Sequence, residues 1–377
     1  MTWPTNPGSR AKLTTGQRKL GEVAEIYQGG KSGLTKKDYV KSGFLAFSAT
    51  GQDGFTKKAF DSGFAVILSS IGARCGKCFY AEGKWTALAN TQVIKLDDPM
   101  AAKFLYYYLN DENKWPRYGS AQPFIAPSTV KRLKVPFPSL PIQKKIVERL
   151  DAIKKTQELN DKQLVLVEEL FQSLLHRELD PKGKNWEVKR LGELSLVITK
   201  GTTPTTYGYR FTDAGIPFLR VEDVNNDLVN PKKTEYHISK ETHEFMKRSK
   251  TEPRDILVTI AGTIGRVAHV PENAPEMNMN QAVAIVRLKP LVNHLYVFYL
   301  LRTKELQRAM KFAEVTGTIT NISLTTLKNL KIPLPPIETQ RKIVEKLSAV
   351  QEYKKKLLKQ KQKLQELFES VLNKSMS

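Results

Sequence analysis

The sequence predicts an α+β protein in which two similar mixed α/β domains are separated by two long helices, packed as an antiparallel, coiled-coil-like pair. Three observations support this prediction. A segment of 48 residues occurs twice, each copy carries apolar residues at helical spacing, and short apolar runs with glycine and proline precede each copy. With 377 residues, 40% of them hydrophobic, the chain can form two separate cores.

The repeated segment is the strongest signal. Residues 133–180 align with residues 330–377 without a gap and are identical at 18 of 48 positions. Leu-Lys-x-Pro-x-Pro begins both copies, the motif Q-x-K-I-V-E-x-L follows, and Glu-Leu-Phe recurs near the end. Upstream, Leu20-Gly-Glu corresponds to Leu191-Gly-Glu at a smaller offset. The chain is therefore a tandem duplication whose second globular part carries insertions.

These offsets divide the chain into five parts. We expect an N-terminal extension (1–17), a first domain (18–132), a first helix (133–180), a second domain (181–329) and a second helix (330–377). Within the domains, the apolar runs at 64–68 and 255–259 predict buried strands, and residues 102–109 and 295–310 predict helices.

Apolar residues in both repeated segments recur in steps of three and four, which indicates a heptad-like seam. From the prolines at 141 and 336 each helix can run about 35 to 40 residues, or roughly 50 to 60 Å. The two stripes pack most simply against each other, although each helix packing on its own domain is the alternative. The expected seam consists of Ile146, Leu150, Ile153, Leu164 and Phe171 in the first helix and Ile343, Leu347, Val350, Leu357, Leu364 and Phe368 in the second.

Charge indicates a polyanionic partner. The 60 Lys and Arg residues exceed the 38 Asp and Glu residues and leave a formal net charge of +22. This excess favours nucleic acid, with an acidic protein partner as the alternative. The polar N-terminus, with Pro4 and Pro7, predicts no signal peptide, and no run approaches the ~18 apolar residues of a membrane span. Two cysteines in a chain of this length favour a reducing cytoplasm.

No catalytic motif is complete in this sequence. Cys75-x-x-Cys78 has no second pair to complete a zinc site, and the glycine that a phosphate loop needs before Gly29-Gly-Lys-Ser would fall at Glu25. A nuclease-like set of Asp180, Glu187 and Lys189 crosses the repeat junction, where an exposed linker is the simpler interpretation. No Asn/Asp-Pro-Pro-aromatic methyltransferase motif is present. We therefore predict no catalytic residue, no metal and no cofactor of its own.

The arrangement resembles the specificity subunits of type I restriction-modification systems, in which target-recognition domains alternate with conserved helices. The resemblance covers nearly the whole chain. It depends on the doubled motifs above, on the loop Lys200-Gly-Thr-Thr-Pro204, and on the glycine turn at residues 261–266. The first half departs from both patterns, with Gln-Gly-Gly-Lys-Ser at 28–32 and Gly-Ala-Arg-Cys-Gly-Lys at 72–77.

Membership would imply a non-catalytic subunit that binds double-stranded DNA and positions two methyltransferase subunits and two motor-nuclease subunits on a split site. Each domain would read one half, and the helix pair would set the gap between them. The methyltransferase subunits would bring S-adenosylmethionine and methylate adenine. Because the two domains differ, the two half-sites should differ too.

Candidate DNA contacts are positive or small polar residues in glycine-containing loops, or residues that follow a short apolar run. Tight turns and surface salt bridges are the alternative explanation for all of them. The candidates are Lys31, Ser32, Lys36, Arg74, Lys77, Ser120 and Gln122 in the first domain and Lys200, Thr202, Thr203, Arg220, Glu222, Arg266, Gln281, Gly317 and Thr318 in the second.

Two other functions remain open from the sequence alone. A stand-alone sequence-specific DNA-binding regulator would bind tightly without a partner, and a nuclease with unrecognised catalytic residues would cut DNA in magnesium.

Overall fold

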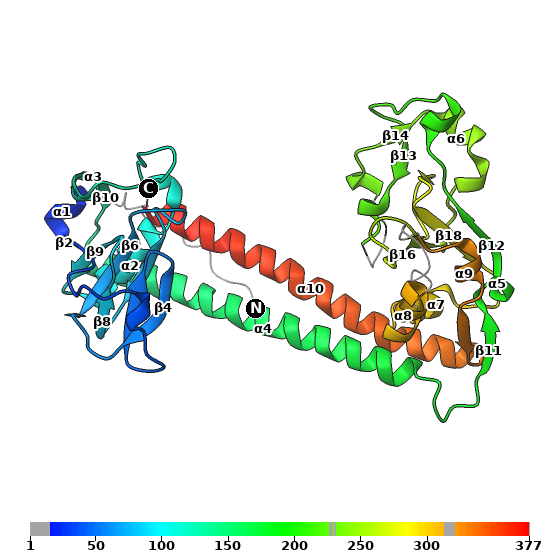
Figure 1. Cartoon of the computed structure of the whole chain (residues 1–377), viewed down its shortest axis with the longest axis horizontal. Helices are drawn as coiled ribbons and strands as arrows, with labels where there is room; N and C mark the ends of the chain where they lie inside the picture. Colours follow the sequence, from blue (N-terminus) through cyan, green and yellow to red (C-terminus); the bar gives the residue numbers. More distant parts are fainter. Residues whose placement is uncertain (1–15, 226–228, 230, 313–320, 377) are drawn as a thin grey trace, which may run out of the picture. The chain divides into compact units, whose positions relative to one another are not determined.

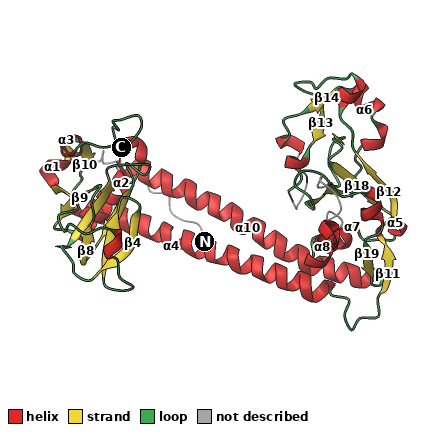
Figure 2. Ribbon diagram, in the orientation of Figure 1, coloured by secondary structure: helices red, strands yellow, loops and turns green. Residues whose placement is uncertain are grey.

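The computed structural model describes residues 16–225, 229, 231–312 and 321–376 (Figure 1). The chain forms two compact units, one of residues 1–162 with 358–377 and one of residues 163–357. Each unit contains a mixed α/β domain and part of two long helices, α4 (Leu140–Leu179) and α10 (Ile337–Met376), as Figure 2 shows. The predicted fold class, two α/β domains with a pair of long helices, is confirmed.

Two four-stranded sheets form the domain of the first unit. One has the strand order β2-β9-β6-β7 and is antiparallel, and the other has the order β4-β3-β8-β5 with β3 and β8 parallel. The strands are β2 (Glu25–Gln28), β3 (Phe44–Ser48), β4 (Gly51–Thr56), β5 (Asp61–Ser62), β6 (Phe64–Ser69), β7 (Cys78–Ala81), β8 (Lys84–Ala87) and β9 (Thr91–Leu96).

The run of apolar residues in β6 is continuous because both faces of the strand are covered. Val66 and Leu68 pack in one buried cluster with helix α2 (Pro99–Leu109), while Ala65 and Ile67 pack in another with Trp85 of the second sheet. Side chains alternate along a strand, so burial on both faces requires apolar residues at every position. The remaining elements are β1 (Gln17–Lys19), α1 (Leu20–Val23), η1 (Lys36–Asp38), η2 (Glu112–Lys114), α3 (Pro127–Arg132) and β10 (Lys134–Pro136).

The domain of the second unit repeats this plan with a three-stranded second sheet. Its sheets have the orders β12-β18-β15-β16 and β14-β13-β17, with β13 and β17 parallel. The strands are β11 (Glu187–Arg190), β12 (Ser195–Lys200), β13 (Ile216–Leu219), β14 (His237–Ile238), β15 (Ile256–Thr259), β16 (Val267–His269), β17 (Asn278–Met279), β18 (Val283–Leu288) and β19 (Lys331–Leu334). The helices are α5 (Leu191–Leu194), η3 (Pro204–Tyr207), η4 (Val221–Asp223), η5 (Pro231–Lys233), α6 (Lys240–Phe245), η6 (Lys247–Ser249), α7 (His294–Leu301), α8 (Lys304–Phe312) and α9 (Leu324–Lys328).

The single helix predicted over 295–310 is wrong, because the structure has two helices, α7 and α8, with a break between them. The side chains of two residues satisfy the carbonyls at the break. The hydroxyl of Thr303 donates to the carbonyl of Leu300 at 2.8 Å, and the amide of Gln307 donates to the carbonyl of Leu301 at 2.8 Å. These side-chain hydrogen bonds compete with continuation of the backbone ladder.

The duplicated Leu-Lys-x-Pro-x-Pro motif forms the base on which each long helix begins. Its first residues form β10 and β19, which pair antiparallel with β1 and β11 respectively. The amides of the buried Leu20 and Leu191 donate to the carbonyls of Leu133 and Leu330, at 2.8 and 2.9 Å. The repeated motif therefore closes each domain onto its helix start through backbone hydrogen bonds.

The repeated glutamine of Q-x-K-I-V-E-x-L fixes the first turn of each long helix. The side-chain amide of Gln143 donates to the carbonyl of Pro138 at 2.7 Å, and that of Gln340 donates to the carbonyl of Pro335 at 2.8 Å. Both glutamines are buried. The same residue at the same place explains one of the 18 identities in physical terms.

A tyrosine and a phenylalanine join each domain to the long helices. In the first unit the hydroxyl of Tyr107 donates to Asp151 of α4 at 2.5 Å, and its ring packs edge-on against Phe368 of α10. In the second unit Tyr299 packs against Phe171 of α4, with ring centroids 5.9 Å apart. The phenylalanines belong to the two Glu-Leu-Phe motifs, so the repeat encodes both contacts.

Polar contacts show that the helices run antiparallel. In the first unit Gln157 faces Gln365 and Asp161 faces Lys361. In the second unit Glu168 accepts a hydrogen bond from Lys354 at 2.6 Å, and Glu178 accepts one from Lys346 at 3.0 Å. As the residue number rises along α4 it falls along α10.

We expect Phe171→Ala to destabilise the second unit by about 3–5 kcal/mol, because the side chain is fully buried and its removal leaves a cavity. Phe368→Ala should cost less, because Phe368 is only partly buried. Denaturant unfolding of each variant measures the free energy of unfolding. A loss below about 1 kcal/mol for Phe171→Ala would contradict the role of this contact.

Glu168→Lys should lower the stability of the helix pair by about 0.5–1 kcal/mol at low salt, because two lysines then face each other. Adding Lys354→Glu should restore it. Gln365→Lys, at the equivalent position facing Gln157, serves as the control and should change little. Failure of the double variant to recover in thermal melting would show that the ion pair does not form.

Candidate nucleic-acid interface

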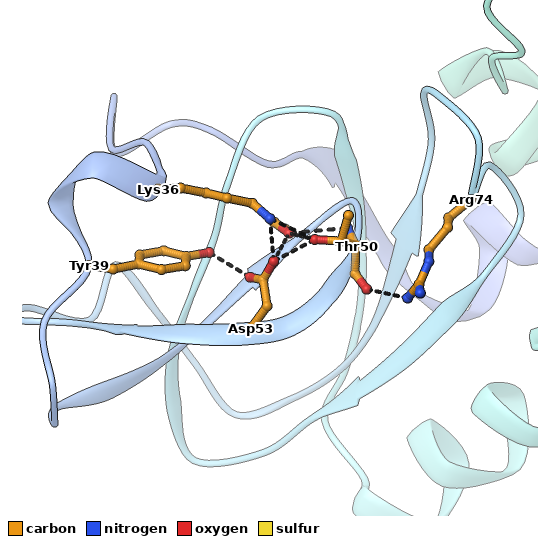
Figure 3. Close-up of polar contacts among 6 residues, drawn as sticks. Lys36, Tyr39, Thr50, Asp53 and Arg74 are labelled. Atoms are coloured by element: carbon orange, nitrogen blue, oxygen red, sulfur yellow. Dashed lines mark hydrogen bonds and ion pairs between the residues drawn. The ribbon is translucent and has the colours of Figure 1, made fainter. Parts of the chain in front are cut away.

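Three loops of the first domain meet at the tip of the β3–β4 hairpin (Figure 3). The carboxylate of Asp53 in β4 accepts hydrogen bonds from the ammonium of Lys36 at 2.5 Å, from the hydroxyl of Tyr39 at 2.7 Å and from Ser48 at 2.7 Å. The hydroxyl of Thr50, at the tip, also donates to this carboxylate. The hairpin and the loop that carries Lys36 are therefore held as one body.

The electrostatics of this cluster favour an ionised carboxylate. Partial burial raises the pKa of the Asp53 carboxyl, but the hydrogen bonds from Lys36, Thr50, Tyr39 and Ser48 outweigh it and hold that pKa well below its usual range. The side chain of Lys36 is 55% exposed, so its cation lies at the surface even though it is paired.

Arg74 joins the same hairpin tip from the glycine turn after β6. Its guanidinium donates to the carbonyl of Thr50 at 2.7 Å. Lys77, at the end of this turn, lies 3.7 Å from the carboxylate of Glu112. The structure therefore brings Lys36 and Arg74 together at Thr50 and gives Lys77 a separate partner.

The loop of Ser120 and Gln122 is bonded to the same glycine turn. The amide of Gly72 donates to the carbonyl of Pro123 at 2.9 Å, and the amide of Ile125 donates to the carbonyl of Ser70 at 2.9 Å. Ser120 and Gln122 are both exposed at the turn of this loop. The loop of Ser120 and Gln122 is thus hydrogen-bonded to the glycine turn that carries Arg74.

Lys31 and Ser32 occupy the loop after β2. The ammonium of Lys31 lies 4.0 Å from the ring centroid of Tyr27, and the hydroxyl of Ser32 accepts a hydrogen bond from the amide of Leu34 at 3.2 Å. A Cβ on Gly29 would lie 2.1 Å from the hydroxyl oxygen of Thr91, so this position requires glycine. The backbone of the loop is held against the chain just before β9.

The loop from Lys200 to Pro204 holds the equivalent place in the second domain. The amide of Gly201 donates to the carbonyl of Val283 and that of Thr202 to the carbonyl of Met279, both at 3.1 Å. A Cβ on Gly201 would lie 2.1 Å from the carbonyl oxygen of Met279. The hydroxyl of Thr203 donates to the side chain of Gln281, so the structure brings these two candidates together.

Arg220 and Glu222 come just after β13. In the first domain the equivalent strand β3 ends at Ser48, and Thr50 follows it. Their side chains form an ion pair with each other at 3.2 Å, and the guanidinium of Arg220 lies 4.6 Å from the ring centroid of Tyr236. The side chain of Glu222 is 61% exposed. A charged pair at the surface thus stands where the first domain has hydroxyl groups.

Arg266 ends the glycine turn between β15 and β16. Its amide donates to the hydroxyl of Thr259 at 2.9 Å, and Gln307 donates to the carbonyl of Gly265 at 2.8 Å. These contacts fix the turn on α8. The candidates Gly317 and Thr318 lie outside the described residues.

Several residues of these surfaces carry no sequence signal that marks them as functional. Tyr39 and Asp53 belong to no repeated motif, and only their hydrogen bonds in the structure reveal them. The same holds for an aromatic group in the second domain, in which Tyr207 and Tyr209 pack against Phe245 with centroids 5.3 and 5.0 Å apart. Tyr207 and Phe245 are both more than half exposed.

The predicted seam residues differ in how far they are buried and in the hydrophobic cluster to which they belong. Ile146 and Leu150 belong to the core cluster of the first domain, and Phe171, Ile343 and Leu347 belong to that of the second. Ile153 and Leu357 are buried, whereas Leu164, Val350, Leu364 and Phe368 are partly buried.

The residues of the possible catalytic motifs are buried or bonded to near neighbours in the chain. Cys75 and Cys78 are free and buried, and burial raises the pKa of both thiols. The carboxylate of Asp180 accepts a hydrogen bond from the amide of Lys182, and Lys189 pairs with Glu187 at 3.2 Å. Within the described ranges, no group of three or more His, Cys, Asp or Glu residues is placed to hold a metal ion. In the same ranges, no helix is both long and apolar enough to cross a membrane.

Comparison with known proteins identifies relatives of this arrangement. The family model described as "Type I restriction modification DNA specificity domain" matches residues 14–169 and 183–367. A putative type I restriction enzyme specificity subunit of Haemophilus influenzae is 24% identical over 340 residues, which cover 87% of this chain and 85% of that protein.

Solved structures share the fold over nearly the full length. The crystal structure of a type I restriction-modification S subunit from M. genitalium has a TM-score of 0.65 at 17% identity and covers 98% of this chain and 97% of that one. A second structure, from work on complex assembly and conformational transition of the type I R-M system, has a TM-score of 0.61 at 19% identity and covers 97% of this chain and 98% of that one.

Gly201→Ala should detach the loop after β12, because the added Cβ cannot fit against the carbonyl of Met279. We expect hydrogen exchange of the Thr202 amide to rise by at least about tenfold. Gly29→Ala should do the same for the Gly30 amide, which donates to the carbonyl of Ala87. Each variant serves as the control for the other, since its effect should remain within its own unit. Unchanged exchange in both would contradict the close approach.

Proposed function

The chain belongs to the type I restriction modification DNA specificity family and is a DNA specificity subunit, and from this premise we propose that each of its α/β domains reads one half of a split, asymmetric DNA site. The observation that carries this proposal is the duplication, in which equivalent strand ends carry different side chains. In the first domain β3 ends at Ser48 and Thr50 follows it, whereas in the second domain Arg220 and Glu222 follow β13. Hydroxyl groups and a charged pair address different base edges, so two different half-sites are expected.

We propose that the loops of the candidate interface contact the DNA. Arg74 and Lys200 supply positive charge for phosphates, which gives affinity without sequence information, and Lys36, paired with Asp53, lies beside Arg74 at the hairpin tip. Arg220 can form two hydrogen bonds with a guanine edge and Glu222 can accept from cytosine. The division into domains at 18–132 and 181–329, with helix segments at 133–180 and 330–377, is part of the same proposal.

The chain is a subunit of a type I restriction-modification system, and we propose that it places two methyltransferase subunits and two motor-nuclease subunits on this site in the cytoplasm. The M. genitalium and H. influenzae relatives are specificity subunits, and the second structural neighbour comes from work on complex assembly. On this proposal the chain has no catalytic residue, and adenine methylation belongs to the methyltransferase subunits.

Co-expression with the adjacent methyltransferase subunit in cells that lack adenine methylation, followed by genome-wide mapping of methylated adenines, tests the proposal. We expect one motif with two unlike halves and an unspecified gap. Arg220→Ala should relax the motif at a position of one half only, at a cost of about 1–3 kcal/mol in binding.

Each alternative predicts a different result. A palindromic motif would contradict the assignment of unlike half-sites to the two domains. Tight specific binding by the chain alone would favour a stand-alone regulator, and cleavage of plasmid by the chain alone in magnesium would favour a nuclease.

A further inference from the structure

We infer that Asp53 is a specificity-determining residue of the first domain, which masks the cation of Lys36 from sequence-independent contact with DNA phosphate. This inference rests on the proposed function, since it requires that the loop of Lys36 faces DNA.

The donors around Asp53 are of the kind that bind a phosphate group. One ammonium and three hydroxyl groups, from Lys36, Tyr39, Ser48 and Thr50, converge on a single carboxylate. Lys36 also donates to the hydroxyl of Thr50 at 2.7 Å, so its ammonium is held at the hairpin tip by two bonds (Figure 3). The carboxylate thus occupies the anion position of this donor set.

The cation of Lys36 is paired with Asp53 but remains at the surface of the domain. Lys36 is 55% exposed, whereas the side chain of Asp53 is 25% exposed and is covered by its donors. Arg74 reaches the same tip but donates to a backbone carbonyl, so it keeps its full charge. The exposed Lys37 lies next to Lys36 in the chain, and among the described residues Lys36 is the cation that pairs with Asp53.

Masking affects correct and incorrect DNA differently. Any duplex offers phosphates, so a free lysine at this position would strengthen binding to every sequence alike. Base contacts, in contrast, need the hairpin tip in one position, and Asp53 provides this by binding Lys36, Ser48 and Thr50 together. The carboxylate therefore lowers non-specific affinity while it orients the groups that face the bases.

The test measures binding of the complex with its methyltransferase subunits to its mapped duplex and to a duplex scrambled in the first half-site. Fluorescence anisotropy between about 50 and 200 mM salt gives the salt dependence, whose slope changes by about 0.9 for each phosphate contact. Asp53→Asn should steepen the slope on scrambled DNA by about 0.9 and reduce the preference for the correct first half-site by on the order of tenfold.

Two further variants isolate the masked cation. Lys36→Gln alone should leave the slope on scrambled DNA unchanged, because the cation is already paired, and Lys36→Gln added to Asp53→Asn should restore the wild-type slope. Asp61→Asn is the matched control. Asp61 accepts a hydrogen bond from Tyr27 at 2.6 Å, so this variant changes the charge of the same domain by the same amount without releasing Lys36.

Three results would overturn the inference: an unchanged slope for folded Asp53→Asn, a steep slope that persists in the double variant, or a slope lowered by about 0.9 in Lys36→Gln alone. The last result remains decisive if Asp53→Asn does not fold, because Lys36 is a surface side chain. If the wild-type complex does not distinguish the mapped duplex from the scrambled one, the proposed function fails instead.

Discussion

The contact between a domain tyrosine and a long-helix phenylalanine is the interaction on which the structure depends. Phe171 packs against Tyr299 in one unit and Phe368 against Tyr107 in the other. Each pair belongs to a hydrophobic cluster shared by a domain and both long helices. Each pair fixes the C-terminal part of one 40-residue helix to a domain, and the Leu-Lys-x-Pro-x-Pro motif of that domain fixes the start of the other helix. The doubled Glu-Leu-Phe motif thus has a structural reason, and it leaves the loops free to differ.

The two domains share a backbone plan and differ in the side chains that it presents. In both, a loop packs closely enough on the chain before a central strand to require glycine, at Gly29 and at Gly201. In both, a strand with a parallel neighbour ends at an exposed tip, with Thr50 in one domain and Glu222 in the other. On the proposed function, this separation of scaffold from loops would let one protein read two unlike sequences, because changes at the tips leave the core untouched.

The sequence predicted the features that arise from periodic or repeated residues. The duplication predicted two similar α/β domains, the apolar steps predicted the long helices, and continuous apolar runs predicted the buried strands β6 and β15. It did not predict the break at Thr303, which depends on side-chain hydrogen bonds, or the cluster around Asp53. That cluster joins Asp53 to Lys36 and Arg74 to Thr50, and no periodicity relates residues at such separations. The contacts of the candidate DNA-binding residues with DNA remain predictions for the same reason.

Exchange of the first domain tests the central claim, that each domain reads its own half of the site, most directly. Residues 18–132 would be replaced by the corresponding domain of a relative, with both long helices retained, and methylated adenines mapped again. We expect one half of the motif to change to that of the relative, while the other half and the gap remain. If the motif changed in both halves, or in neither, while the complex still assembled and methylated DNA, the two domains would not read separate halves.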